Sequence, residues 1–149
     1  LFNQDNGTGR VVTIGGAGFL HSYDYVGRWL ARVPANYKRD LETRFPGSPA
    51  GGGSDNASFV AAGVPAFSLS SNSWLYGSYT WHTNRDTYDK VVFDDVQNNA
   101  ILTAILVYMA CEDPSKTQRD KIVLPANSRT GEPGKWPAQR SPTRKGGVD

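Results

Sequence analysis

Short strand-like runs alternate along this chain with stretches of helical periodicity. Residues 11–14 are β-branched and lie between glycines, and residues 66–70 follow Pro65, so both runs are predicted strands. Residues 23–33 and 95–112 carry apolar side chains at helical spacing, which predicts two amphipathic helices. This alternation favours an α/β sandwich in which helices cover a largely parallel sheet.

The helix ends are predicted from the residues that commonly cap them. Ser54 and Asp55 are typical N-cap residues for a third, short helix, and Gly63 is a typical C-terminal stop. We expect Asp94 or Asp95 to cap the long helix in the same way.

Charge and proline content divide the chain near residue 113. Up to that point the chain has eight basic and eleven acidic residues, whereas residues 114–149 have eight basic residues, three acidic residues and five of the nine prolines. We therefore expect residues 1–113 to be the C-terminal part of a catalytic domain and residues 114–149 to be a basic, proline-rich extension. The extension is expected to be ordered only where it packs on the domain.

The composition excludes several classes of protein. The net charge of +2 is too small to indicate nucleic acid as a partner. The sequence contains no run of about 18 apolar residues, which is the length that a membrane-spanning helix needs. The single cysteine, Cys111, excludes an internal disulfide and a cysteine-based zinc site, and it leaves the compartment open. Because Leu1 is not preceded by a methionine or a signal peptide, we expect a piece of a longer chain.

Two polar residues follow predicted strands and have metal-binding side chains. Asp5 ends the strand-like residues 1–4, and His82 lies in a polar loop with Asp86 four residues further on. Imidazole is a common metal ligand that a carboxylate often orients, so Asp86 is a candidate for that supporting role. On local sequence alone, however, a turn residue and a structural histidine are the simpler interpretations.

A glycine-rich loop and an aromatic loop complete the candidates. The loop at residues 51–56 lacks the lysine and the spacing of a P-loop, so Asp55 is better interpreted as a cap or a site-loop acid than as part of a phosphate site. The aromatic residues of the second loop either line a pocket or simply pack the loop down. They are Trp74, Tyr76, Tyr79 and Trp81.

Taken in order, three segments resemble the zinc aminopeptidase and glutaminyl cyclase family of co-catalytic metallopeptidases. They are Phe2-Asn3-Gln4-Asp5, then Gly53-Ser54-Asp55-Asn56-Ala57-Ser58-Phe59 with Gly63-Val64-Pro65, and finally His82-Thr83-Asn84-Arg85-Asp86-Thr87. The resemblance implies part of a three-layer α/β sandwich with a mixed, largely parallel sheet. It also implies two zinc ions, with Asp5 a ligand of one and His82 a ligand of the other. The loop around Asp55 would then lie beside the substrate pocket.

The chain departs from the family pattern at two positions. Asn56 stands where the family often has histidine, and Trp81 stands where many aminopeptidases have a tyrosine that can stabilise the oxyanion. Glutaminyl cyclases tend to have tryptophan at that second position. Because an indole donates a hydrogen bond but cannot ionise, an oxyanion role would pass to Tyr79, Tyr76 or another group.

The family's other catalytic residues cannot be placed in this chain. The family supplies a His-x-Asp ligand segment, a bridging aspartate and a Glu-Glu pair from its N-terminal half, whereas here no acid pair precedes Asp5 and the only other histidine is His21. We therefore expect the chain to be the C-terminal half of such an enzyme. Without the missing N-terminal half of the same domain, it should bind zinc weakly and hydrolyse nothing.

The resemblance implies that the intact protein is a secreted or periplasmic exopeptidase. It would cleave peptide substrates at the N-terminus with a water activated by two zinc ions, and the general-base glutamate would lie in the missing half. Two alternatives remain open. The pair Trp81-His82 is compatible with a glutaminyl cyclase-type acyltransferase, and the fold is also compatible with a non-catalytic binding module.

Overall fold

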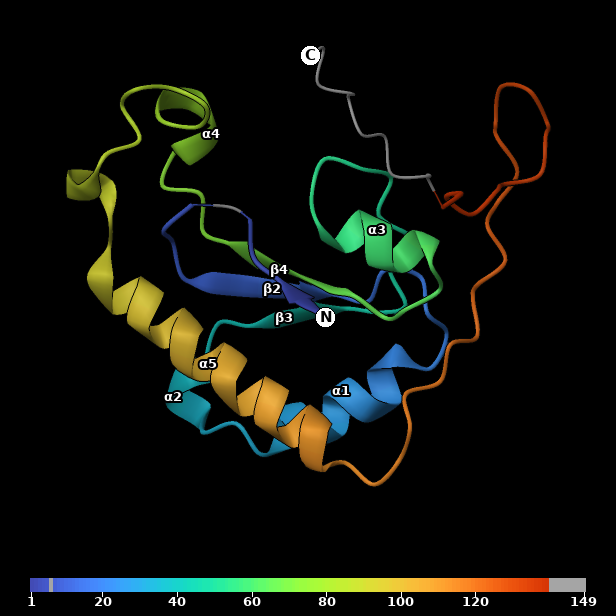
Figure 1. The fold of residues 1–149 in the computed structure, drawn as a ribbon, viewed down its shortest axis with the longest axis horizontal. Helices are drawn as coiled ribbons and strands as arrows, with labels where there is room; N and C mark the ends of the chain where they lie inside the picture. The colour runs from blue at the N-terminus through green and yellow to red at the C-terminus, as the bar shows by residue number, and fades with distance from the viewer. Residues whose placement is uncertain (6, 140–149) are drawn as a thin grey trace, which may run out of the picture.

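A four-stranded sheet runs through the centre of the computed structural model, which describes residues 1–5 and 7–139 (Figure 1). The strands are β1 (Phe2–Asn3), β2 (Val11–Gly15), β3 (Glu42–Arg44) and β4 (Phe67–Ser71), in the spatial order β1-β4-β2-β3. β1 is parallel to β4 and β2 is parallel to β3, while β2 and β4 are antiparallel. The sheet is therefore mixed and largely parallel, as predicted.

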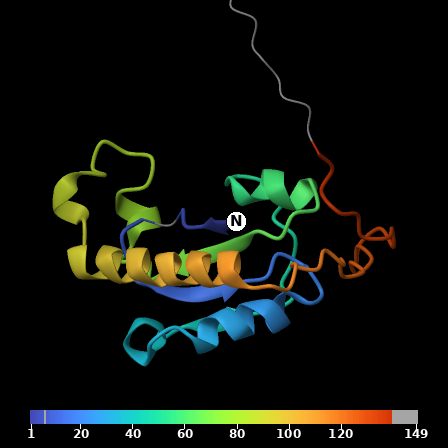
Figure 2. The same ribbon diagram turned by 60° about the horizontal axis from the view of Figure 1, so that its bottom comes forward.

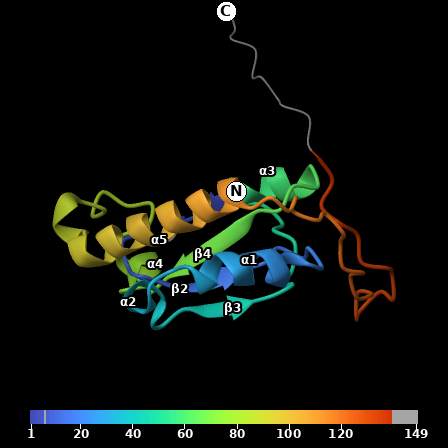
Figure 3. The same cartoon turned by 90° about the horizontal axis from the view of Figure 1, so that it is seen from below.

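Helices cover both faces of this sheet. α1 (Ser22–Ala31), α2 (Ala35–Lys38) and α5 (Phe93–Glu112) lie on one face, and α3 (Asn56–Ala61) lies on the other (Figures 1 and 2). From the side of α1 and α5, both helices lie in front of the strands (Figure 3). The prediction of a three-layer α/β sandwich is thus confirmed. None of the described helices combines the length and apolar character needed to cross a membrane.

The main hydrophobic core lies between the sheet and the face formed by α1 and α5. Phe67 and Leu69 of β4 point to this face, because successive side chains of a strand point to opposite sides. In β2 the core residues Val11 and Ile14 are three positions apart, because the pairing with β4 shifts register between Val11 and Thr13. The buried core residues are Val11, Ile14, Tyr25, Val26, Trp29, Val33, Phe67, Leu69, Leu102 and Leu106. A smaller cluster packs on the α3 side and consists of Ala17, Phe19, Val60 and Ala66.

The long helix begins two residues earlier than predicted. α5 begins at Phe93, and its N-cap is Val92, with no side-chain cap. Instead, the N–H of Val92 donates to Thr8 Oγ1 at 2.6 Å, so a residue from another part of the chain satisfies one of the free N–H groups of this end. Asp95 accepts from Arg10 Nε at 3.2 Å, and the prediction that Asp94 or Asp95 caps the helix is wrong.

One buried amide joins α5 to the loop that precedes β2. The Oδ1 of Asn99 accepts from the N–H of Val11, and its Nδ2 donates to the carbonyl of Gly9, both at 2.8 Å. Asn99, Val11 and Gly9 are all buried, so water cannot replace these bonds. The amide therefore fixes the position of the loop between β1 and β2.

We predict that Asn99→Ala lowers the free energy of unfolding by about 2–4 kcal/mol, because it leaves a buried N–H and a buried carbonyl without partners. Urea unfolding followed by circular dichroism measures the loss. Gln97→Ala, on the exposed side of the same helix, is the matched control and should change the midpoint little. Equal effects of the two substitutions would contradict the role of the buried amide.

Residues 114–139 follow the body without forming a further helix or extended strand. Their backbone meets the body at an antiparallel bridge between Lys121 and Phe19, and the N–H of Ile122 donates to the carbonyl of Gly18 at 3.0 Å. The rest of the predicted extension, residues 140–149, lies outside the described residues.

Trp136 makes the main side-chain contact between this segment and the body. Its ring lies 5.5 Å from that of Phe19, its Nε1 donates to the carbonyl of Ile122 at 3.1 Å, and Lys121 Nζ lies 4.8 Å from the ring centroid. In contrast, Val123, in the middle of the apolar residues 122–124, is 96% exposed. The segment is thus attached through the side chain of Trp136 and the backbone of Ile122.

We predict that Trp136→Ala speeds tryptic cleavage after Arg129 about two- to tenfold. The aromatic pair with Phe19 contributes about 0.5–1.5 kcal/mol beyond the area that it buries, and its loss favours local opening. Gel analysis of a limited digest measures the rate. Val123→Ala, also in the segment, should leave the rate unchanged, and an unchanged rate in Trp136→Ala would show that Trp136 does not hold the segment.

Candidate functional site

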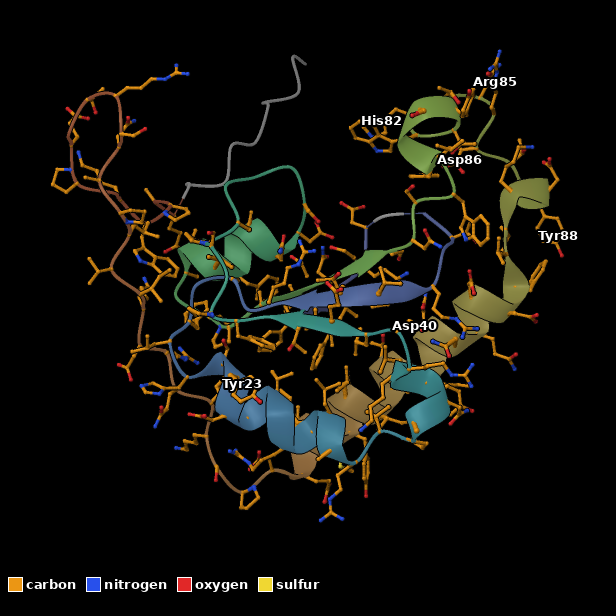
Figure 4. The ribbon with its side chains drawn as sticks, turned by 180° about the vertical axis from the view of Figure 1, so that it is seen from behind. Tyr23, Asp40, His82, Arg85, Asp86 and Tyr88 are labelled. Carbon is orange, nitrogen blue, oxygen red and sulfur yellow. The ribbon has the colours of Figure 1, made fainter. Side chains whose placement is uncertain are left out.

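Asp5 and His82 meet at one end of the sheet. Because β1 and β4 are parallel, their carboxyl ends lie at the same edge, and the segments that follow them are brought together there. Asp5 follows β1, and His82 follows the short helix α4 (Tyr76–Tyr79), which lies beyond β4 (Figures 1 and 4). Both side chains line the same two hollows of the surface.

The two hollows lie on either side of the sheet end. We call the first the α5 hollow: it has a volume of about 890 Å³ and lies between the sheet end and α5. Its apolar lining residues are Phe2, Leu69, Val96, Ala100 and Ala104. The second, the serine hollow, has a volume of about 820 Å³ and is lined by Asn3, Gly52, Gly53, Ser54, Asn56, Ser68, Ser70, Ser71, Ser73 and Gly77. Both hollows are also lined by Asp5, Tyr76, Trp81 and His82.

Strand alternation separates the chemistry of the two hollows. In β1, Phe2 lines the α5 hollow and Asn3 the serine hollow, and in β4 the neighbours Leu69 and Ser70 are divided in the same way. The candidate ligands thus lie between the α5 hollow, which has both apolar and polar lining residues, and the serine hollow, which is mainly polar.

The backbone of His82 is in the left-handed region, with a φ of 58°. This backbone conformation costs free energy for any residue other than glycine, and residues strained in this way cluster at functional sites. The imidazole ring stacks on Trp81, with ring centroids 4.2 Å apart and planes inclined by 30°. His82 is exposed toward the hollows, so a metal ion could reach it.

Asp86 contacts Tyr76 rather than His82. The Tyr76 hydroxyl donates to Asp86 Oδ2 at 2.9 Å, so the sequence-based suggestion that Asp86 supports His82 is not what the structure shows. This hydrogen bond is the main reason that the pKa of Tyr76 is raised, and partial desolvation and the charges of Asp86 and Asp5 raise it further. Tyr76 is therefore a neutral phenol between the two hollows at neutral pH.

We predict that Asp86→Ala lowers the pKa of Tyr76 toward its ordinary value of 10.0, because the substitution removes both the hydrogen-bond acceptor and the nearest negative charge. The ¹³Cζ tyrosine resonance, assigned with Tyr76→Phe, reports this titration by NMR. Asp89→Ala removes a nearby exposed carboxylate and should leave the pKa of Tyr76 in place. An unshifted pKa in Asp86→Ala would mean that the pair does not form in solution.

The three other residues that the sequence suggests for the pocket, Trp81, Tyr79 and Asp55, take different positions relative to the two hollows. Trp81 lines both hollows, whereas Tyr79 is 60% exposed and lines neither of them. Asp55 is the N-cap residue of α3, but its side chain makes no capping bond, and it is its neighbours Ser54 and Asn56 that line the serine hollow. The sequence suggests Tyr76 as one of several groups that could take over the oxyanion role at the Trp81 position. In the structure it is the tyrosine that lines both hollows with Asp5 and His82.

The chemistry of Asp5 and His82 fits zinc, which takes carboxylate oxygen and imidazole nitrogen as ligands. Among the described residues, however, no group of three histidine, cysteine or acidic side chains could hold a metal ion. His21, the other histidine, lies at the start of α1 with its nitrogens 3.7 Å from Asp24 and from Asp120, and it lines neither hollow. The described chain therefore offers Asp5 and His82 as two candidate ligand side chains at the site.

The fold thus brings a carboxylate and an imidazole, two side chains that bind zinc in many proteins, to one edge of an α/β sheet. Residues 7–107 match Peptidase family M28, and the chain belongs to this family of metallopeptidases. The match includes His82 and begins just after Asp5. No curated protein and no solved structure matches the chain.

Proposed function

We propose that this chain contributes to the active site of a zinc aminopeptidase in which Asp5 binds one of two zinc ions and His82 the other. The observation that carries the proposal is that these two residues, far apart in the sequence, line the same two hollows at the carboxyl end of β1. Membership of a metallopeptidase family supports the reaction class, and the resemblance of the three sequence segments supports the two-metal site and the action at peptide N-termini.

The described residues around the ligands suggest how a substrate would be held. Two bound zinc ions would polarise the scissile carbonyl and activate a water for attack. Trp81 carries an indole N–H that can donate to a carbonyl oxygen, whereas the Tyr76 hydroxyl donates its one hydrogen to Asp86 and can only accept from a substrate. Both side chains lie beside Asp5 and His82, where a reacting carbonyl would bind.

The remaining metal ligands and the general base would come from a further segment of the same domain. A catalytic zinc ion needs about three protein ligands, and the described residues offer two side chains for two ions. The α5 hollow is the surface that we propose for this segment, because it lies beside β1, the edge strand of the sheet, and includes the apolar side chains of Phe2, Leu69 and Val96. We propose a secreted or periplasmic location from the family resemblance alone.

We predict that Asp5→Ala and His82→Ala in the whole protein each remove about one of two zinc ions, and that each lowers the hydrolysis of aminoacyl p-nitroanilides at least about 100-fold. Mass spectrometry of the metal content and release of p-nitroaniline measure the two effects. His21→Ala, which removes the other imidazole, should keep both zinc and activity. The 149 residues alone should release no p-nitroaniline.

Three outcomes would contradict this proposal. The first is full zinc content in both ligand variants, and the second is hydrolysis by the 149 residues alone. The third is the formation of a cyclised lactam, in place of a released residue, from peptides with N-terminal glutamine. That product would identify a glutaminyl cyclase-type acyltransferase instead.

A further inference from the structure

Two amide–hydroxyl pairs form the wall of the serine hollow. Asn3 Nδ2 donates to Ser54 Oγ at 2.6 Å, and Asn56 Nδ2 donates to Ser68 Oγ at 2.7 Å. Asn56 is only 3% exposed, so its side chain is held in place by packing. Ser70 lies on the same face of β4 as Ser68 and also lines the hollow.

These pairs leave both donors and acceptors free to bind a ligand. In each pair the serine oxygen accepts, so the hydroxyl hydrogen of Ser54 or Ser68 remains available to donate. In each pair the amide uses a nitrogen, so Oδ1 of Asn3 or Asn56 remains available to accept. Ser70 Oγ has no hydrogen-bond partner among the described residues and can act in either way. The wall therefore offers free donors and free acceptors close together.

The charges around the hollow exclude a charged ligand group. No lysine or arginine lines it, and its one acidic side chain, Asp5, is a proposed zinc ligand. A carboxylate or an ammonium group on the substrate side chain would have no counter-ion there other than Asp5, and an apolar side chain would displace water from the polar wall without replacing its hydrogen bonds. A primary amide, with an acceptor oxygen and two donor hydrogens, matches the wall.

We assign the two hollows to different binding partners. The α5 hollow lies beside the edge strand β1, and we have proposed it as the contact surface for the rest of the domain. The serine hollow is lined by β1, β4, α4 and the loop at residues 52–54, and it is open to solvent. Because Asp5 and His82 also line it, the serine hollow lies within reach of the first side chain of a substrate bound at the proposed zinc site.

We infer that the serine hollow binds the side chain of the substrate's N-terminal residue and selects an uncharged amide, asparagine or glutamine. This inference rests on the proposed aminopeptidase function and adds the substrate class to it. Ser70 is its specificity-determining residue, since its hydroxyl belongs to neither amide–hydroxyl pair and is free to bind the substrate amide.

Hydrolysis of peptides that differ only in the first residue tests the selection. Asparagine and leucine have nearly the same shape, and so do glutamine and glutamate, so the pairs Asn-Ala-Ala with Leu-Ala-Ala and Gln-Ala-Ala with Glu-Ala-Ala separate polarity and charge from size. With the whole zinc-loaded protein we expect kcat/KM to be at least about tenfold higher for the amide of each pair. An equal or higher kcat/KM for leucine would overturn the inference.

Ser70→Ala tests whether the wall itself makes the selection. We expect the ratio of kcat/KM for Asn-Ala-Ala to that for Leu-Ala-Ala to fall about tenfold, because one hydrogen bond to the substrate amide is lost. Ser78→Ala, on α4 and outside both hollows, should leave this ratio unchanged. An unchanged ratio in Ser70→Ala would show that the polar wall is a solvated face without a role in selection.

A binding measurement separates failure of this inference from failure of the proposed function. If the protein cleaves none of these peptides, the aminopeptidase proposal falls, and calorimetry with L-asparagine and L-leucine then decides the chemistry of the hollow. Tighter binding of asparagine that Ser70→Ala weakens would support the amide subsite. Equal binding of the two amino acids, or none, would overturn it. If the peptides are cleaved without preference for the amide, the function stands and the inference falls.

Discussion

The parallel pairing of β1 with β4 is the contact on which the arrangement of the site depends. β1 contributes only two residues, which pair with Phe67 and Ser68 of β4. This short pairing places Asp5 at the same sheet edge as the loop that carries His82. If the two strands were antiparallel, the same residues would lie at opposite ends of the sheet and could not line the same hollows.

The two-residue period of the strands explains how one end of a small sheet can carry two different surfaces. Leu69 faces the core side and lines the α5 hollow, while Ser68 and Ser70 lie on the opposite face and form part of the serine hollow. A shift of one residue in the pairing would exchange these sets and bury serines in the core. The requirement for a dry core on one face therefore also keeps the polar wall in place on the other.

Much of the fold could be predicted from the sequence, because the patterns concerned are local. The β-branched residues 11–14 became β2, the apolar spacing of residues 23–33 became α1, and Gly63, with its φ of 75°, follows α3 as expected. β3 and α2 could not be predicted in this way. Glu42–Arg44 has no buried face, and it is a strand only because it pairs with β2.

Asp5 and His82 could be recognised as candidate ligands from the amino-acid sequence, as could the order of the segments around them. The partner of Asp86, the position of Tyr76 between the hollows and the contact of Trp136 with the body became apparent only in the folded chain. The two kinds of feature depend on interactions of different range along the chain. Periodicity and caps depend on neighbours within a few residues, whereas the surroundings of a side chain at a site depend on strands and loops that meet only after the sheet has formed.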